Sequence, residues 1–224
     1  MFIWKVAPLA RYFVNSILVC LITMFISVGI SCFGAYALNR FRFRGRDTVG
    51  MLQFGQTMIP KVLYVLPYYL LLIHINSWIG IRLIGTYFAL IVTYIAFTLP
   101  INIWMLRGYY ETIPIELEEA AMIDGSSKIG ALLRITLPLA WPGVIAVGIL
   151  TFIISWNEVL LASVLTTQDT RTVAVGIIEY ETKLVANWGY ILSAGAVVSI
   201  PLVVLFTFMQ KHMVSGMTRG AVKY

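Results

Sequence analysis

Charged residues are scarce in this chain: Asp, Glu, Lys and Arg make up 12% of its 224 residues, whereas hydrophobic residues make up 60%. A soluble domain carries about 25% charged residues. Together with a mean hydropathy of +0.88, this composition excludes a globule whose whole surface faces water. It predicts an all-α, polytopic membrane protein that forms a single transmembrane domain over residues 1–224.

Residues that form disulfides or hold metal ions are also rare. The two cysteines, Cys20 and Cys32, fall in one apolar run, about 18 Å apart along a helix, which is too far for a disulfide between them. The two histidines, His74 and His212, lie in different segments, so no metal site is indicated. No glycine is followed by lysine, which excludes the G-x-x-x-x-G-K-[ST] phosphate loop. With no readable pair of nucleophile and base, we expect neither catalysis nor a cofactor in this chain.

Five apolar stretches are long enough to cross the hydrocarbon layer, which requires a helix of about 20 apolar residues. The second stretch contains Pro60, Lys61 and Pro67, so we expect it to be kinked or broken. The predicted spans cover about residues 12–38, 49–75, 84–106, 141–165 and 188–209.

Basic residues are concentrated in three polar segments. The four-arginine loop Asn39–Asp47, the central loop at about 107–140 and the tail at 210–224 hold ten of the sixteen Lys and Arg residues. Cytoplasmic loops carry such an excess, so we predict a cytoplasmic central loop and C-terminus, and an N-terminus outside. The four-arginine loop could bind acidic lipid or RNA. At the end of a span a membrane anchor explains it more simply, and we expect no nucleic-acid partner.

The longest polar interval, residues 114–142, has the pattern of two helices joined by a sharp turn. It opens with a proline, which suits the first turn of a helix, and Gly125 sits where a helix commonly ends in a left-handed conformation. Ser126 or Ser127 can cap a second helix, which we expect Pro138 to stop. Taken alone, this pattern also fits an ordinary helical hairpin on a membrane surface.

Within this interval, an acidic residue, two alanines and a glycine at a fixed distance precede an Ile-x-Leu-Pro. These residues are Glu119, Ala120, Ala121, Asp124, Gly125, Ile135, Leu137 and Pro138. The combination is specific, and it resembles the EAA loop of type I ABC importer permeases.

Other segments are similar to the carbohydrate-uptake branch of that family, whose members usually have six spans. An Asn-Ser pair, Asn15 and Ser16, opens the first span, and a Trp-Asn-Glu motif lies at residues 156–158. Three further motifs match: the exit of the first span, the start of the central interval, and the tail. They rest on Tyr36, Ala37, Arg40, Phe41, Phe43 and Gly45, on Ile113, Pro114, Glu116 and Leu117, and on Gly216, Thr218, Gly220, Ala221, Val222 and Lys223. The matches cover nearly all of the chain and indicate a maltose-transporter-like inner-membrane subunit.

The resemblance implies the permease subunit of a bacterial importer that moves a sugar or sugar-like solute inward across the cytoplasmic membrane. The implied partners are a second permease subunit in a heterodimer, two ATPase subunits that bind ATP and Mg, and an extracytoplasmic solute-binding protein, with lipid around the spans. The central loop would couple ATP hydrolysis by these partners to alternating access. The chain itself would then be no enzyme.

Candidate site residues fall in three places. The resemblance implies contact with the ATPase subunits by the loop residues Glu116, Glu119, Ala120, Ala121, Asp124 and Gly125, and by the tail residues Gly216, Arg219 and Lys223. In the fourth predicted span, Asn157 and Glu158 are candidates for the translocation pathway. An acid at mid-membrane costs about 2.5–3.5 kcal/mol on insertion scales, so Glu158 must be paired or hydrated, and it could instead tie two spans together.

The sequence leaves alternatives open. An importer permease for amino acids, phosphate or metal ions would share the central loop, although the tail favours sugars. A stand-alone secondary transporter or channel needs coupling-ion carboxylates within the membrane, and Glu158 is the one candidate. A non-transporting scaffold is a third class. Since the first span and outer loop that are usual in the branch are missing, we expect either that the sequence starts inside a longer protein or that five spans suffice.

We predict that Glu119→Lys weakens association with the ATPase subunits, because the resemblance implies a groove and a basic partner for this glutamate. A partly buried ion pair that loses one member leaves the other charge desolvated. Ala120 and Ala121 should resist enlargement, since close approach to a groove requires small residues. Co-purification of the ATPase and solute uptake measure these effects. Full retention of both by Glu119→Lys would indicate a loop that merely connects spans.

Overall fold

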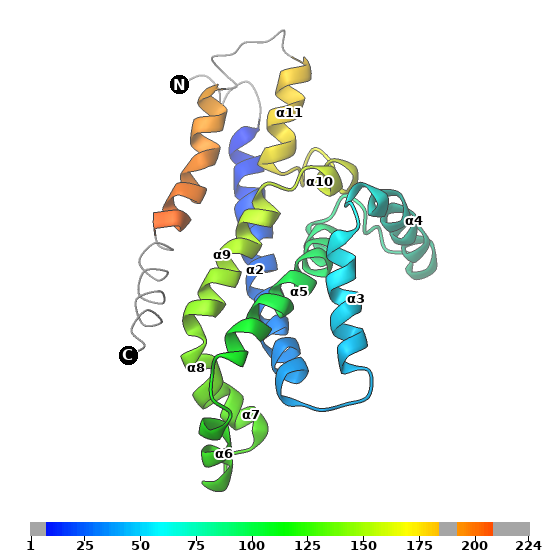
Figure 1. The fold of residues 1–224 in the computed structure, drawn as a ribbon. Helices are drawn as coiled ribbons and strands as arrows, with labels where there is room; N and C mark the ends of the chain where they lie inside the picture. Colours follow the sequence, from blue (N-terminus) through cyan, green and yellow to red (C-terminus); the bar gives the residue numbers. More distant parts are fainter. Residues whose placement is uncertain (1–7, 184–191, 208–224) are drawn as a thin grey trace.

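The computed structural model describes residues 8–183 and 192–207, and throughout these residues the chain is helical with connecting turns. The long helices alternate with short ones that turn the chain at either end of the bundle (Figure 1). The helices are α2 (Leu9–Arg40), α3 (Arg46–Met58), α4 (Val62–Ile79), α5 (Tyr87–Glu111), α6 (Glu116–Ile123), α7 (Lys128–Ala131), the π-helical turn η1 (Leu132–Thr136), α8 (Leu137–Leu139), α9 (Trp141–Trp156), α10 (Leu160–Leu165), α11 (Val173–Lys183) and a last helix, Leu192–Thr207.

Helix α2 lies at the centre of the bundle and packs along both α5 and α9 (Figure 1). The face that it buries includes a row of small residues spaced three or four apart: Ser16, Cys20, Thr23, Ser27, Ser31 and Ala35. Helices in lipid gain no hydrophobic driving force from pairing, so small side chains, which allow close contact between backbones, favour association. A row of small residues therefore runs along the packing face of α2, between larger buried side chains such as Tyr12, Val19 and Tyr36.

A buried polar cluster joins the three central helices near their middle. The hydroxyl groups of Ser27 on α2 and Thr98 on α5 are 2.8 Å apart. The amide of Asn102 donates to Ser27 Oγ at 3.0 Å and accepts from Thr151 Oγ1 on α9 at 3.0 Å. These four side chains are almost completely buried, and a polar group that is buried without a partner is costly. The cluster therefore favours one register of α2, α5 and α9.

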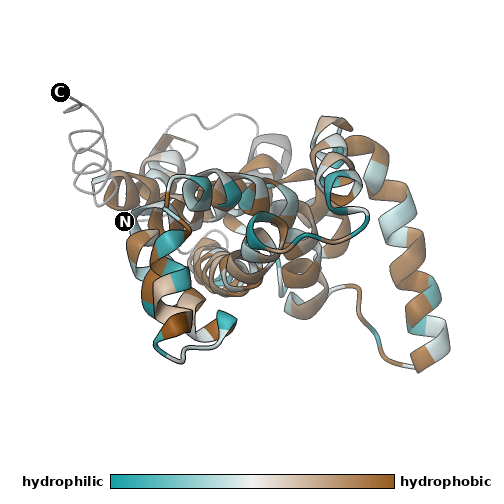
Figure 2. Ribbon diagram, turned by 60° about the horizontal axis from the view of Figure 1, so that its bottom comes forward, coloured by the Kyte–Doolittle hydropathy of each residue, from teal (hydrophilic) through white to brown (hydrophobic). Residues whose placement is uncertain are grey.

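Among the described residues, three helices are long and apolar enough to cross a membrane, namely α2, α4 and α5. A fourth crossing is available if residues 128–156 form one span, which is bent by 78° between α8 and α9. Figure 2 shows that apolar residues dominate the long helices. Helix α2 extends beyond the predicted range 12–38 at both ends, and α5 continues past residue 106 to Glu111.

The predicted second span, residues 49–75, consists of two helices in the structure. Helix α3 ends at Met58, Pro60 lies in the break, and α4 begins at Val62. Proline has no N–H to donate and restricts the residue before it, which explains the break, whereas Pro67 is accommodated inside α4. Helix α3 buries none of its residues and α4 buries one of them.

The predicted fourth span, residues 141–165, is interrupted after Trp156. Helix α9 ends there, Asn157 occupies the C-cap, and the short helix α10 follows. Between the predicted fourth and fifth spans, the structure contains helix α11. The last described helix falls within the predicted fifth span and accommodates Pro201. Residues 188–191 and 208–209 of that span lie outside the described residues.

A close contact between α5 and α9 generates a stability prediction. A Cβ atom added at Gly143 would overlap the ring of Tyr109, whereas one at Gly148 on the same helix would lie 3.7 Å from Met24 Cγ, an ordinary contact. Overpacking of this kind costs about 1–3 kcal/mol. We expect Gly143→Ala to lower the thermal unfolding midpoint of the purified protein and Gly148→Ala to leave it nearly unchanged. Equal midpoints for the two variants would contradict this packing.

Candidate functional site: the α6–α7 hairpin

The interval between α5 and α9 folds into a hairpin of short helices at one end of the bundle (Figure 1). Helix α6 ends at Ile123 and is closed by two reverse hydrogen bonds, from Gly125 N to Met122 O at 3.1 Å and from Ser126 N to Ala121 O at 2.9 Å. Gly125 has φ +91°, as this type of helix ending requires. The sequence pattern therefore predicted the sharp turn at the correct residue.

The second half of the hairpin begins as expected and ends differently. Ser127 is the N-cap of α7, and its hydroxyl accepts from Gly130 N at 3.1 Å. We expected Pro138 to stop this helix, but it does not. The chain stays helical through Leu139 because the π-helical turn η1 precedes the proline, with Leu137 N donating to Leu132 O. A wider turn rearranges the backbone hydrogen bonds where proline lacks its N–H group.

One face of α6 is exposed and combines acids with small and apolar residues. Glu116, Glu119 and Ala120 are exposed, and Ile123 at the end of the helix is 86% exposed. Neither acid forms a hydrogen bond or ion pair to any described residue. Asp124 and Gly125 are exposed as well, and Ala121 is half-buried. Five of the six residues expected to contact an ATPase are thus exposed.

Glu118 is the functional residue that the sequence reasoning missed. Its neighbour Glu119 is exposed, but Glu118 is 2% exposed and is contacted by three side chains. Its Oε1 accepts from Arg40 Nε at 2.9 Å and from Thr136 Oγ1 at 2.7 Å, and its Oε2 accepts from the Tyr36 hydroxyl at 2.9 Å. One carboxylate therefore joins α6 to the end of α2 and to η1.

Arg40 and Tyr36 extend this network to the end of α5 and to α7. Arg40 also donates to the backbone oxygens of Tyr110 and Ile113, at 3.2 and 2.9 Å, where α5 ends. The Tyr36 hydroxyl lies 3.2 Å from the backbone oxygen of Lys128. The arginine of the motif at the exit of the first predicted span thus anchors the hairpin, a role that its place in a basic loop did not suggest.

The apolar pattern of α6 gave little indication that Glu118 would be buried. Residues three and four positions later, Ala121 and Met122, are half-buried, while Leu117 and Ala120 are exposed. The buried face of α6 therefore runs through an acid, and apolar periodicity does not detect such a face. To find Glu118 from the sequence, one would have had to look for an acidic partner of Arg40, the first arginine of the four-arginine loop.

Asn157 and Glu158, the candidate pathway residues, occupy the break between α9 and α10. Glu158 is buried, and its carboxylate accepts from Leu161 N and Ala162 N, each at 3.1 Å, and from the Tyr94 hydroxyl at 3.3 Å. Such contacts stabilise the beginning of a helix. Asn157 is exposed and donates to Ile153 O at 2.9 Å. The structure thus gives Glu158 a full set of local partners and leaves the polar group of Asn157 at the surface.

The tail residues Gly216, Arg219 and Lys223, expected to contact the ATPase, lie outside the described residues.

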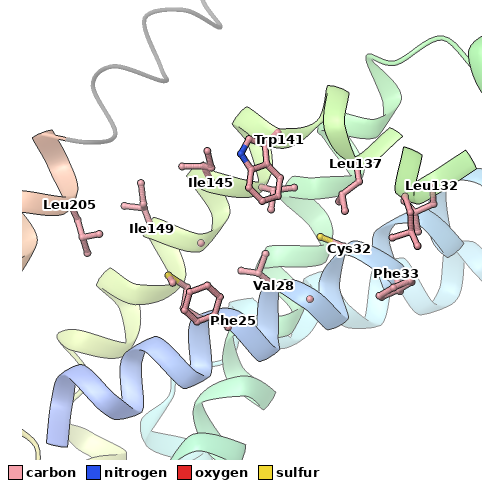
Figure 3. Close-up of a pocket in the computed structure, with 15 residues that line it drawn as sticks. Phe25, Val28, Cys32, Phe33, Leu132, Leu137, Trp141, Ile145, Ile149 and Leu205 are labelled. Atoms are coloured by element: carbon pink, nitrogen blue, oxygen red, sulfur yellow. The ribbon is translucent and has the colours of Figure 1, made fainter. Parts of the chain in front are cut away.

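The described residues also line an open apolar cavity of about 560 Å³. Figure 3 shows that its walls come from α2, η1, α8, α9 and the last helix. The walls are almost entirely hydrocarbon, with residues such as Phe25, Val28, Leu137, Ile149 and Leu205. A polyhydroxylated solute needs hydrogen-bonding groups to replace the water that it loses. We therefore do not assign this cavity to a polar solute.

Comparison with known families decides what kind of protein carries this hairpin. A family model described as "Binding-protein-dependent transport system inner membrane component" matches residues 12–219. The chain belongs to this family. The resemblance drawn from the EAA-like loop is thereby confirmed, and the protein is a multi-pass membrane permease component of an ABC transporter.

Curated relatives and solved structures are consistent with this membership. The permease is 36% identical over 217 residues to the inner membrane ABC transporter permease protein YcjP of Escherichia coli, covering 96% of this chain and 75% of the relative. It is 37% identical over 214 residues to the trehalose/maltose transport system permease protein MalG of Thermococcus litoralis, covering 95% and 75%. A chain of a bacterial ABC transporter involved in alginate import superposes with a TM-score of 0.75 at 22% identity, over 90% of this permease and 74% of that chain. This last likeness confirms the importer fold.

The backbone at Gly125 generates a prediction about the hairpin. No atom lies within 4 Å of a Cβ added there, so the cost of a side chain comes from φ +91° alone. A left-handed conformation costs a residue with a side chain about 1–2 kcal/mol. We expect Gly125→Val to redirect α7 and abolish transport while the permease still inserts. The matched control is Gly108→Val on α5, where space is equally open and φ is not positive. Full uptake by Gly125→Val would contradict a requirement for this turn.

Proposed function

We propose that this permease is one of two membrane subunits of a binding-protein-dependent importer that moves a sugar or sugar-like solute into a bacterial cell. The observation that carries the proposal is the hairpin, which is anchored on one side by Glu118 and presents free acids on the other. A surface helix whose backbone hydrogen bonds are internal moves as a rigid body. Such a hairpin is suited to pass motion between a soluble ATPase and the membrane helices.

The ATPase contact would be made by the exposed face of α6. Glu119 has no partner among the described residues and is accessible to a cation on another protein. Ala120 beside it lets a groove approach closely, and Ile123 adds apolar area at 86% exposure. Central apolar contacts with charges at the rim are usual for protein interfaces. ATP and Mg would be bound by the two ATPase subunits, and the chemistry of hydrolysis would be theirs.

A sugar is the solute class that the relatives favour. The names of the relatives describe transport of trehalose and maltose in Thermococcus litoralis, of diacetylchitobiose in Streptomyces coelicolor, and of trehalose in Mycobacterium tuberculosis. These relatives are 33–37% identical over 94–95% of this chain. A solute-binding protein outside the cell and a second permease, in a heterodimer, would complete the importer. Asn157 is retained as a candidate for the pathway because its polar group is exposed.

We place the hairpin and the C-terminus in the cytoplasm. The hairpin lies at the same end of the bundle as the loop between α2 and α3 (Figure 1), which carries Arg42 and Arg44. An excess of basic residues marks the cytoplasmic side. Segments 80–86 and 157–172 would then face outward.

Reconstitution tests the proposal. The permease is co-expressed with a partner permease, an ATPase and a solute-binding protein from the same organism, and the purified complex is placed in proteoliposomes. We expect ATP-dependent uptake of a labelled disaccharide such as trehalose or maltose, with ATPase activity stimulated by the loaded binding protein.

The outcomes separate the proposal from its alternatives. Uptake of an amino acid, phosphate or a metal ion with no uptake of any sugar would overturn the solute class and keep the importer. Transport by the permease alone, driven by an ion gradient and without an ATPase, would indicate a secondary transporter. An assembled complex with no transport at all would indicate a scaffold.

A further inference from the structure

At the cytoplasmic end of α2, a buried carboxylate binds two side chains of this helix to the hairpin. The side chains of Arg40 and Glu118, with exposed fractions of 12% and 3%, form an ion pair at 2.9 Å. Tyr36, one turn earlier on α2, donates to the other oxygen of the same carboxylate. Because both oxygens of Glu118 are held by α2, a displacement of α6 cannot leave α2 in place without breaking a buried ion pair.

The opposite end of α2 is bound to the outer segment that precedes α11. Asn15 donates through its amide to the backbone oxygens of Asp169 and Arg171, at 3.0 and 2.9 Å. The hydroxyl of the next residue, Ser16, accepts from Val173 N at 2.8 Å, where α11 begins. Asn15 and Ser16 are both buried. These three hydrogen bonds therefore hold the backbone of the outer segment against α2.

From these two attachments we infer that α2 transmits displacement of the α6–α7 hairpin to the outer segment 167–173, and that Glu118 is the positioning residue through which the hairpin engages α2. The attachments at Ser16 and Tyr36 are 20 residues apart, or about 30 Å along a helix. The intervening helix contains no proline, and it runs as one uninterrupted α-helix from Leu9 to Arg40. The inference rests on the proposed function, since it takes the motion of the hairpin from the ATPase.

This role differs from that of the exposed acids on the same helix. Glu119 would contact another protein, whereas the carboxylate of Glu118 is bound by three side chains of its own chain. Loss of Glu118 should therefore leave ATPase binding in place and remove the response of the outer segment. A purely stabilising role for Glu118 predicts lower stability and no selective loss of that response.

Labelling of the outer segment in the complete importer tests the inference. Gln168 is exposed in the segment, and a Gln168→Cys variant is made in a background with Cys20→Ala and Cys32→Ala. The rate of its reaction with a maleimide is measured in nanodiscs without nucleotide and with ATP under conditions that prevent hydrolysis. We expect ATP to change the rate in this parent, and Glu118→Gln or Asn15→Ala to abolish the change while the ATPase still co-purifies.

Two further variants keep the test decisive. Glu118→Gln alone leaves the Arg40 guanidinium buried without its partner, so Glu118→Gln/Arg40→Gln, which removes both charges, is measured if the single variant does not assemble. Glu111→Gln is the matched control, since it removes an acid from an exposed ion pair with Arg107 on α5. We expect the double variant to lose the ATP-dependent change and Glu111→Gln to keep it.

The inference is wrong if the double variant retains the full ATP-dependent change in labelling. It is also wrong if the parent takes up sugar with ATP but shows no change at position 168, and in that case the proposed function stands. Failure of the parent to transport any sugar would instead count against the proposed function, while an ATP-dependent change in labelling that requires Glu118 would still support transmission through α2.

Discussion

The ion pair between Glu118 and Arg40 is the interaction on which the placement of the hairpin depends, because it joins α6 to the end of α2 by a buried contact between charged groups. The pair is buried, and its remaining hydrogen-bonding capacity is used by Tyr36, Thr136 and two backbone carbonyls. Removal of one member of such a pair costs about 3–5 kcal/mol. A buried pair of this kind adds little to net stability. Its effect here is on orientation: it holds α6 with Glu118 facing inward, so that Glu116 and Glu119 face outward.

The division of work among neighbouring acids follows from that arrangement. Glu116, Glu118 and Glu119 lie within one turn of the same short helix, yet the middle one is buried and the other two are exposed. A carboxylate that is fully occupied inside the chain cannot recruit a partner protein, whereas an exposed one can. The same residue type is therefore an internal anchor at one position and an exposed acid at the next.

The bundle above the hairpin is held by close packing and by a few polar contacts rather than by hydrophobic exclusion of water. Small residues bring α2 against α5 and α9, and Ser27, Thr98, Asn102 and Thr151 join these helices near their middle. Interhelical hydrogen bonds in membranes are individually modest, about 0.6 kcal/mol on average. Their geometry nevertheless excludes other registers, so that attachments at both ends of α2 belong to one continuous element.

The sequence by itself determined the class of the protein and the local form of its hairpin. Scarcity of charge and long apolar runs indicate a membrane protein, and Gly125 at the end of a helical pattern predicts a turn there, because composition and local conformational preference are properties of single residues and short segments. The EAA-like motif was sufficient to identify the family.

Only the tertiary structure decided which acid of α6 is buried, that Pro138 is accommodated after a π-helical turn, and that Glu158 caps α10 beside Tyr94. These outcomes depend on partners that are far away in the sequence. Arg40 and Glu118 are 78 residues apart, and no local pattern marks one as the partner of the other. Helical periodicity indicates where apolar side chains recur along a helix, so it cannot detect a buried face that is built around a charged residue.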